Sequence, residues 1–125
     1  PDFSDKNTVI YGHNMNDGSM FASIANYRTQ EFYESFPVMD LYTPTADYKI
    51  ELFAGYVANA NEPFIQFVFQ DDADFLNYID WLKLISTFES QVTIGPEDRI
   101  VTLSTCTYDF DNARYVVFGK LVPVN

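Results

Sequence analysis

The sequence is poor in the residues that most often carry catalysis, because its 125 residues include one cysteine, Cys106, and one histidine, His13. A single cysteine cannot form a disulfide within the chain, so the cysteine count leaves the redox compartment open. One thiol and one imidazole are too few for a structural zinc site, and no carboxylate has ligand-like spacing to either. We therefore expect no metal and no other cofactor.

Basic residues are also scarce. The chain has 7 lysines and arginines against 18 acidic residues, a net charge of −11. Such a chain repels phosphate backbones, which argues against a nucleic-acid partner. Apolar runs long enough to span a membrane, a secretory signal, a glycine-rich phosphate loop and a Gly-x-Ser-x-Gly elbow are all missing from the sequence. The phosphate-loop and serine-hydrolase classes therefore find no support.

Hydrophobic and aromatic residues, in contrast, are plentiful. They make up 47% and 18% of the chain, which argues against disorder and predicts a well-filled interior. The length fits one domain, residues 1–125. Apolar residues recur in short alternating or continuous runs, which is typical of strands. The expected strands cover residues 7–13, 38–43, 48–56, 64–69, 99–106 and 113–122.

Helical spacing is clearest over residues 71–88, where Asp71 or Asp72 is placed to cap the N-terminus. A second helix is expected over 29–36 with Thr29 as its cap, and residues 20–27 also show helical spacing. The pattern predicts a mainly β fold with inserted helices (α+β), and a barrel with helical crossovers fits it better than a doubly wound parallel sheet. The expected buried stripe of the long helix consists of Phe75, Leu76, Ile79, Leu82 and Ile85.

Cys106, His13 and Arg114 together offer the groups that thiol catalysis needs. Such chemistry requires a thiolate, a proton donor for the leaving group and a group that stabilises the oxyanion. Cys106 and Arg114 are 114 − 106 = 8 residues apart, enough for a turn that brings their strands side by side. The alternative stays open at this point, since a lone strand cysteine is usually a small buried hydrophobe and a lone histidine usually a surface residue.

The segment Thr102-Leu103-Ser104-Thr105-Cys106 resembles the TLxTC signature of sortases, the cysteine transpeptidases of Gram-positive cell surfaces, and Ser104 resembles the class B form. The resemblance extends over most of the chain in the same order. It includes Tyr11-Gly12-His13-Asn14, the helix expected at 71–88, Asp98-Arg99-Ile100 before the cysteine strand, and Arg114 after it.

This resemblance implies a sortase-like β-barrel. Residues 1–125 would form the C-terminal portion of a single sortase catalytic domain, without the N-terminal helices and first strands that the family has. The barrel would then be incomplete at its N-terminal side and leave unpaired strand edges. Closing the sheet would then take the missing part of the domain, self-association with a partner copy, or a strand exchange.

The resemblance also implies a role for each residue of the trio. Cys106 would attack the carbonyl of a threonine in a sorting motif of the Asn/Ser-Pro-x-Thr type. His13 would protonate the departing amine and later deprotonate the incoming one. Arg114 would hold the substrate backbone and stabilise the oxyanion, a task that suits its planar charged fork. The thioacyl intermediate would be resolved by an amine of peptidoglycan or of a pilin.

Four further residues are implied to contact substrate. Tyr11 and Ser104 would line the groove near the nucleophile, and Phe64 and Ile65 would help form its wall. The implied partners are surface proteins that carry sorting signals and the amine acceptor. The implied location is the extracellular face of the cell membrane, with the anchor not present in this chain.

Three other interpretations are kept beside this one. The chain could be a non-catalytic, aromatic-rich β domain that binds peptides and buries Cys106. It could be a truncated and inactive sortase fragment. It could also be a thiol hydrolase, which differs from a transpeptidase only in using water as the acceptor.

Overall fold

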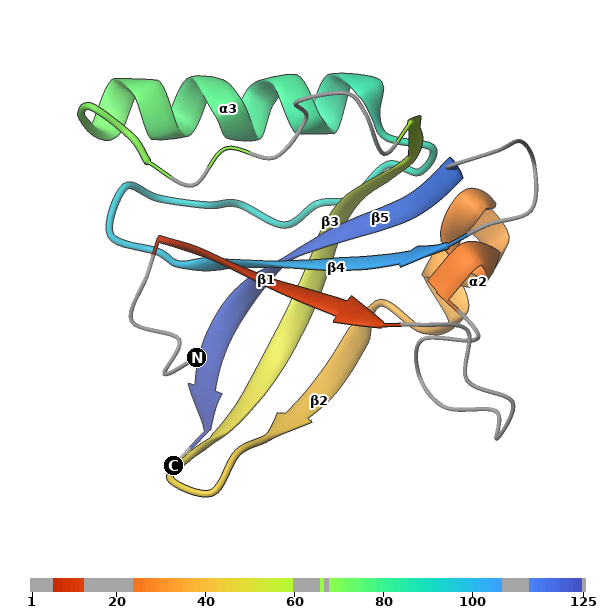
Figure 1. Ribbon diagram of the computed structural model, residues 1–125, viewed down its shortest axis with the longest axis horizontal. Coiled ribbons are helices and arrows are strands. Elements are labelled where there is room, and N and C mark those ends of the chain that lie inside the picture. The colour runs from red at the N-terminus through yellow and green to blue at the C-terminus, as the bar shows by residue number, and fades with distance from the viewer. Residues whose placement is uncertain (1–5, 13–23, 60–65, 67, 107–112, 125) are drawn as a thin grey trace.

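Five strands and three helical segments make up the described fold (Figure 1). The computed structural model describes residues 6–12, 24–59, 66, 68–106 and 113–124. The strands are β1 (Asn7–Gly12), β2 (Val38–Tyr42), β3 (Asp47–Asn59), β4 (Ile100–Cys106) and β5 (Ala113–Val124). The helical segments are η1 (Ile24–Arg28), α2 (Gln30–Ser35) and α3 (Asp72–Ile85).

The strands form one twisted sheet in the order β1-β4-β5-β3-β2, so β1 and β2 are its edges among the described residues. Only the β1–β4 pair is parallel; the other three pairs are antiparallel. The longest pair is β3 with β5, which has a bulge between Leu52 and Ala54. The predicted mainly β fold with inserted helices is confirmed, and the described sheet is open, as expected for an incomplete barrel.

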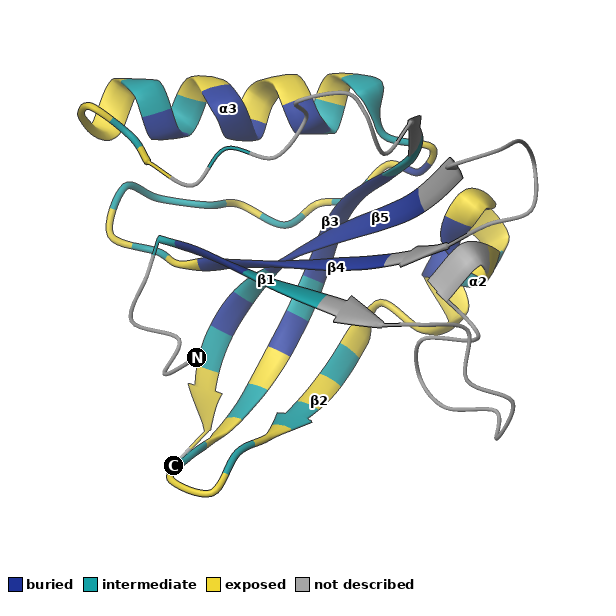
Figure 2. Ribbon diagram, in the orientation of Figure 1, coloured by how far each residue is buried: buried dark blue, intermediate teal, exposed yellow. Residues whose placement is uncertain are grey.

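Helix α3 forms where the sequence predicts it, because its N-terminus is capped and one of its faces is apolar. The Asp71 carboxylate accepts a hydrogen bond from the Asp74 amide at 2.9 Å. Acidic residues in the first turn and Lys83 in the last turn match the helix dipole. The buried side of the helix lies toward the sheet (Figure 2). Of the expected stripe, Phe75, Ile79 and Leu82 are buried, Leu76 and Ile85 are half-buried, and Tyr78 is a further buried member.

The two N-terminal helical segments differ from each other in regularity. In α2 the predicted cap is confirmed, since the Phe32 amide donates to Thr29 Oγ1 at 3.2 Å. The helix expected over 20–27 is described only from residue 24 onward, and there η1 is a 3-10 helix. Tyr27 then packs edge-on against Phe32, with ring centroids 4.8 Å apart.

The two faces of the sheet bury separate apolar layers. Helix α3 covers one face, and residues of η1, α2 and the segment after α3 cover the other. The α3 layer contains Phe53, Ala54, Phe75, Tyr78, Ile79, Leu82, Ile100, Val116 and Phe118. The opposite layer contains Tyr27, Tyr33, Ile50, Leu52, Phe88, Val101, Leu103, Tyr115, Val117 and Leu121.

The strand expected over 64–69 is not formed by its described residues, Gln66, Val68 and Phe69. The Phe69 ring packs on Phe75 and Tyr78 of α3, at centroid distances of 5.0 and 5.6 Å. An apolar run indicates burial but not the partner that buries it. Here the partner is the helix, whereas the prediction assumed the sheet; the rest of the run lies outside the described residues.

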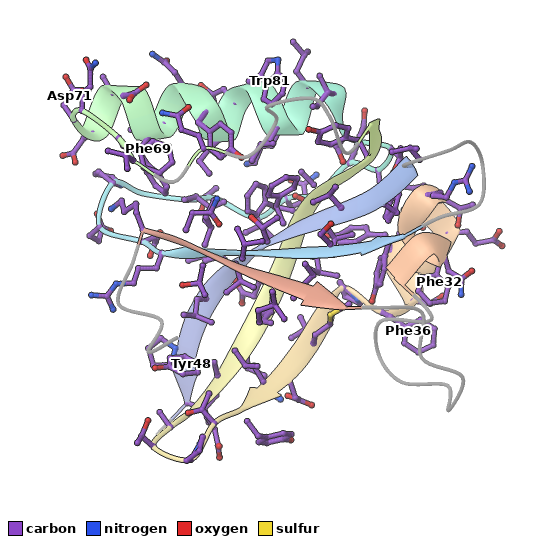
Figure 3. All side chains as sticks on the ribbon, viewed as in Figure 1. Phe32, Phe36, Tyr48, Phe69, Asp71 and Trp81 are labelled. Carbon is purple, nitrogen blue, oxygen red and sulfur yellow. The ribbon has the colours of Figure 1, made fainter. Side chains whose placement is uncertain are left out.

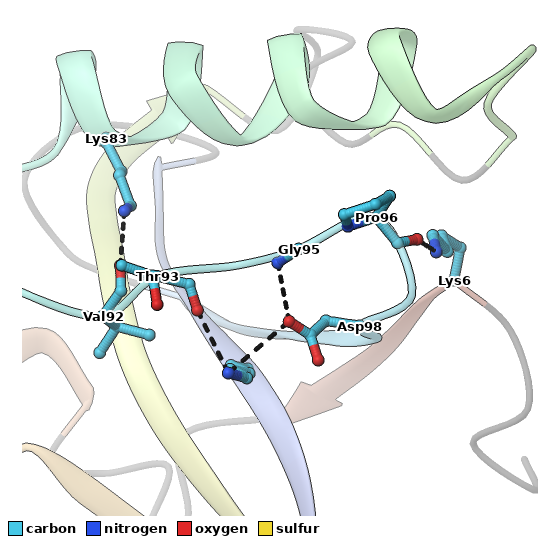
Figure 4. A network of polar contacts seen from close by, with 8 residues as sticks. Lys6, Lys83, Val92, Thr93, Gly95, Pro96 and Asp98 are labelled. Carbon is cyan, nitrogen blue, oxygen red and sulfur yellow. Dashed lines mark hydrogen bonds and ion pairs between the residues drawn. The ribbon is translucent and has the colours of Figure 1, made fainter.

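Polar contacts hold the connection from α3 to β4 in place (Figure 4). The Asp98 carboxylate accepts a hydrogen bond from the Gly95 amide at 2.8 Å and lies 3.6 Å from Lys120 Nζ. Lys120 also donates to the Thr93 carbonyl at 3.2 Å. Because Asp98 lies just before Ile100, these contacts tie the start of β4 to β5. Further bonds run from Lys83 Nζ to the Val92 carbonyl at 2.5 Å and from Lys6 Nζ to the Pro96 carbonyl.

Gly119 in β5 allows a close approach of the sheet's own side chains. A β-carbon added there would lie 2.2 Å from Cγ2 of the fully buried Ile50. We expect Gly119→Ala to lower the free energy of unfolding by about 1–3 kcal/mol, because Ile50 must move within a packed core. Denaturant unfolding measures this change.

Gly95→Ala is the matched control. Its added β-carbon would meet the carboxylate of Glu97 at 2.9 Å, the end of a flexible and exposed side chain that can turn away. We expect it to change the free energy of unfolding by less than about 0.5 kcal/mol. Equal effects of the two substitutions would contradict the packing argument.

Candidate functional site

Three strand ends meet at the candidate site. Cys106, the last residue of β4, is the Cα partner of Arg114 in β5. The C-terminal end of β1 lies beside the same end of β4, with Gly12 opposite Thr105 and Tyr11 opposite Ser104. These strand ends lie together at one end of the sheet (Figure 1). The expectation that the Cys106 and Arg114 strands lie side by side is confirmed, and the residues between them, where a turn was expected, lie outside the described residues.

The predicted site residues are described to different extents. His13, Phe64 and Ile65 lie outside the described residues. Tyr11, Cys106 and Arg114 are described as strand positions. Ser104 is described with its side chain. The structure therefore brings four strand positions together in register: Tyr11, Ser104, Cys106 and Arg114.

Ser104 places a hydroxyl inside the sheet, two residues before Cys106. The residue is 1% exposed, and its Oγ makes no hydrogen bond to any part of the chain that the structure describes. Its strand partners are Tyr11 in β1 and Val116 in β5. A buried hydroxyl without a partner is costly. Ser104 Oγ is such a group at this end of β4, as far as the described residues show.

A second buried hydroxyl on β4 is fully paired. Thr102 Oγ1 donates to Asn7 Oδ1 at 2.8 Å, and both residues are at most 2% exposed. Thr102 and Ser104 lie on the same face of β4, because residues i and i+2 of a strand share a face. The Asn7–Thr102 bond therefore fixes β1 to β4 on the α3 side of the sheet, below the strand ends.

Tyr115 lies next to Arg114 and locks β5 to two other segments. Its hydroxyl is 2.7 Å from the Tyr27 carbonyl of η1 and 2.7 Å from Thr87 Oγ1, which follows α3. Thr87 Oγ1 is also 3.1 Å from the Tyr27 carbonyl. Burial raises the pKa of Tyr115 from its ordinary value of 10.0 to about 12, although the hydrogen bond to Thr87 opposes this. The phenol therefore stays neutral and keeps its proton for these bonds.

Gly55 in β3 completes this junction. Its amide donates to Ser86 Oγ at 3.0 Å and its carbonyl accepts from the Thr87 amide at 2.7 Å. A β-carbon at Gly55 would lie 2.8 Å from the Tyr115 hydroxyl. Glycine is therefore needed at this position, and the end of α3 is joined to both β3 and β5.

Aromatic rings border the site on the α3 side. Tyr56 of β3 is the strand partner of Val116. Its ring stacks on Phe118 at 6.2 Å and meets Trp81 edge-on at 6.3 Å. Trp81 lies on α3 and is 43% exposed (Figure 3). The rings give this part of the sheet a rigid apolar support.

The described part of the chain contains neither a membrane-spanning helix nor a cluster of metal-binding side chains. None of its helices is long and apolar enough to cross a bilayer. Within the same residues, no three His, Cys, Asp or Glu side chains gather closely enough to hold a metal ion.

The sequence analysis missed the roles of Asn7, Thr87 and Tyr115. One signal was available for Tyr115, because a phenol within an apolar strand usually needs a hydrogen-bond partner when buried. Its partners, however, are 28 and 88 residues away in sequence. No spacing rule could have identified them.

Comparison with known proteins points to one family. The family model described as Sortase domain matches residues 2–122. Sortase B of Listeria monocytogenes is 40% identical over 123 residues, and Sortase B of Staphylococcus aureus is 32% identical over 121 residues. These matches cover 97% and 95% of this chain and 50% of each relative. The chain thus spans about half the length of both curated relatives.

A solved structure agrees with these matches. The structure of a Staphylococcus aureus sortase B-substrate complex superposes with a TM-score of 0.86 at 32% identity. The superposition covers 97% of this chain and 57% of that one. The similarity therefore extends through the sheet and the helices described above.

Burial of the Tyr115 phenol predicts how the free energy of unfolding changes at alkaline pH. Its folded-state pKa of about 12 lies above the unfolded value of 10.0, so between these values the unfolded chain releases a proton that the folded chain retains. The free energy of unfolding should therefore fall as pH rises from 10 to 12, by about 1.4 kcal/mol per pH unit for this residue. Denaturant unfolding across this range should show a shallower fall in Tyr115→Phe.

Tyr42→Phe is the control, because it removes a phenol that is 72% exposed. Its pH dependence should match that of the unsubstituted chain. An identical slope in all three proteins would show that Tyr115 is not held neutral by the fold.

Proposed function

The chain belongs to the sortase family, and from this membership we propose that it carries the catalytic residues of a class B cysteine transpeptidase. The proposed substrate is a surface protein with a sorting motif of the Asn/Ser-Pro-x-Thr type. The proposed product joins its threonine to an amine of the cell wall or of a pilin. The site would act at the extracellular face of the membrane.

One observation carries the proposal: Cys106 and Arg114 are direct strand partners. Antiparallel partners lie on the same face of a sheet, with their β-carbons about 5 Å apart. A thiol and a guanidinium that start from such positions can both reach one carbonyl group. His13 follows Gly12 in sequence, and the pairing of Gly12 with Thr105 supports its assignment as the third member.

In the first step the Cys106 thiolate attacks the threonine carbonyl carbon, and a C–S bond forms. The carbonyl oxygen becomes an oxyanion, which the Arg114 guanidinium stabilises with two parallel N–H donors. The C–N bond to the following residue then breaks. His13 gives its proton to the departing amine, which leaves an acyl group on sulfur.

In the second step an incoming amine attacks the thioacyl carbon. Neutral His13 accepts the amine proton while the C–S bond breaks and the thiolate returns. The net reaction exchanges one amide bond for another, so it needs no cofactor and no external energy source. Water in place of the amine gives hydrolysis, the alternative that differs only here.

The groove for the sorting motif is proposed around the trio. Tyr11 and Ser104 are assigned to its base near Cys106, and Phe64 and Ile65 to its wall. Ser104 is assigned from its place two residues before Cys106, and its Oγ has no hydrogen-bond partner among the described residues. The rings of Tyr56 and Trp81 lie on the α3 side of the sheet and give this region a packed apolar border.

Cys106→Ala tests the nucleophile. We expect cleavage of a sorting peptide to fall by at least about 10³-fold, because no other thiol is present, while the circular dichroism spectrum stays unchanged. Mass spectrometry of the products, with and without a candidate amine, measures cleavage and shows transfer separately from hydrolysis. Unchanged cleavage in the variant would remove Cys106 from the mechanism. Failure of the unsubstituted chain to cleave would favour the inactive-fragment or peptide-binding alternative.

Arg114→Lys tests the role of the guanidinium. The charge is kept but the planar pair of donors is lost, so kcat/KM should fall by about 10²- to 10³-fold. The rate of Cys106 alkylation by iodoacetamide should change much less, since that reaction forms no oxyanion. Arg99→Lys, at an exposed position before β4, is the matched control. Near-normal turnover in Arg114→Lys would exclude the oxyanion role.

A further inference from the structure

Arg114 lies near the end of both ladders in which β5 takes part. It forms the last pair of the β4–β5 ladder, with Cys106, and the next-to-last pair of the β3–β5 ladder, with Ala58. Pairs at the end of a ladder open more readily than inner pairs, because they have a neighbouring pair on one side only. Backbone pairing alone therefore gives Arg114 less support than it gives the residues further along β5.

Tyr115, the next residue, is held from the other face of the sheet. Successive residues of a strand belong to opposite faces. Tyr115 is fully buried in the layer under η1 and α2, whereas Val116 is buried in the α3 layer. By this alternation Arg114 occupies a position on the α3 face, as its partner Cys106 does. A contact of Tyr115 can therefore hold this part of β5 without entering the face of the candidate site.

The Tyr115 hydroxyl is joined to two segments outside the ladders. It donates to the Tyr27 carbonyl at 2.7 Å and lies 2.7 Å from Thr87 Oγ1. Because Thr87 Oγ1 also donates to the Tyr27 carbonyl, at 3.1 Å, the three groups form a closed triangle, which we call the Tyr115 triangle. The Thr87 amide donates to the Gly55 carbonyl at 2.7 Å. The Tyr27 hydroxyl donates to the Phe36 carbonyl at 2.7 Å, so both partners of Tyr115 are themselves fixed.

We propose that Tyr115 positions Arg114 for its role at the reacting carbonyl, through the hydrogen bonds of the Tyr115 triangle. The inference rests on the oxyanion role proposed for Arg114. Tyr115 is a positioning residue, because its hydroxyl lies on the face opposite to the candidate site. Its bonds add to the strand pairing and keep the adjacent position of β5 in register with Cys106. A misplacement of about 1 Å can reduce a catalysed rate by about 10²-fold, so a modest loosening of the strand end is enough to reduce turnover.

Tyr115→Phe removes the hydroxyl and keeps the ring that fills the core. With a fluorogenic sorting peptide we expect kcat to fall by about fivefold to tenfold, the effect of about one lost hydrogen bond, and KM to stay within about threefold. The fall is in kcat because the oxyanion forms in the transition state and not in the bound substrate. Alkylation of Cys106 by iodoacetamide forms no oxyanion and should keep its rate within about twofold. A rise in KM with unchanged kcat, or an equal fall in the alkylation rate, would overturn the proposal.

A double-mutant cycle with Arg114→Lys shows whether Tyr115 acts through Arg114. Once the planar fork of Arg114 is lost, the exact placement of its strand position matters much less. In the Arg114→Lys background, Tyr115→Phe should therefore lower kcat/KM by less than about twofold, against about fivefold to tenfold in the unsubstituted chain. Effects that multiply in full would mean that Tyr115 acts independently of Arg114, and the positioning role would be refuted.

Thr87 offers a second variant, at an exposed position where a substitution disturbs the core less. Thr87→Val removes one corner of the Tyr115 triangle and leaves the bond from Tyr115 to the Tyr27 carbonyl in place. We expect kcat to fall by about twofold to fourfold. Thr87→Ser keeps the hydroxyl and should restore kcat to within about 1.5-fold of the unsubstituted value. Equal kcat in the two Thr87 variants would contradict the proposal.

Tyr33→Phe is the matched control. Tyr33 is also a buried phenol of the η1–α2 layer, but it lies on α2 and bonds Ser90 rather than holding β5. Its kcat and KM should stay within about twofold of the unsubstituted values. A fall in kcat as large as that of Tyr115→Phe would show that loss of any buried phenol of this layer reduces turnover, which would overturn the proposal.

Hydrogen exchange measures the support of β5 without any activity. In Tyr115→Phe, exchange should rise for peptides that cover residues 113–117 and stay unchanged for peptides that cover 119–124. An equal rise along the whole of β5, or none at 113–117, would overturn the proposal. If the unsubstituted chain turns over no sorting peptide, the proposed function fails, and the catalytic part of this inference fails with it. A local rise in exchange would still show that the Tyr115 triangle holds the strand end.

Discussion

The register of β4 against β5 is the constraint on which the rest of the molecule depends. β4 is buried on both faces, so a slip by one residue would send every side chain to the wrong layer. Ile100 packs under α3 while Val101 and Leu103 pack into the opposite layer. The same register that satisfies these two layers makes Cys106 and Arg114 partners. A single register of β4 against β5 therefore both packs the core and brings the strand positions of the candidate site together.

Polar groups within this sheet show how the two layers are joined to the site. The buried Asn7–Thr102 pair and the part-buried Tyr115–Thr87 pair lie on opposite faces, and each ties a strand of the site to another segment. These hydrogen bonds fix the relative positions of the segments that they join. Apolar contacts alone would not do so, because they have no directional preference. Ser104, two residues before Cys106, differs in that its Oγ has no hydrogen-bond partner among the described residues.

Much of the fold could be predicted from the sequence, because strand alternation and the capped helix α3 are local signals. The strand expected over 64–69 was wrong for its described residues, since an apolar pattern does not specify the packing partner and Phe69, which is half-buried, packs on α3. The pairing of Cys106 with Arg114 followed from a short spacing and a family motif. The Asn7–Thr102 bond, across 95 residues, had no such signal. The placement of His13, Phe64 and Ile65 stays a prediction.

The parallel pairing of β1 with β4 has a consequence for how the chain folds. It joins residues that are 100 − 7 = 93 positions apart, whereas β4 and β5 are neighbours in sequence. Contacts of such separation form slowly, because the intervening chain must first be ordered. The β2–β3 hairpin and α3 can form early, and β1 can join only after β4 exists. The thiol strand would thus meet its upstream partner late, so folding itself delays the moment at which the candidate site is complete.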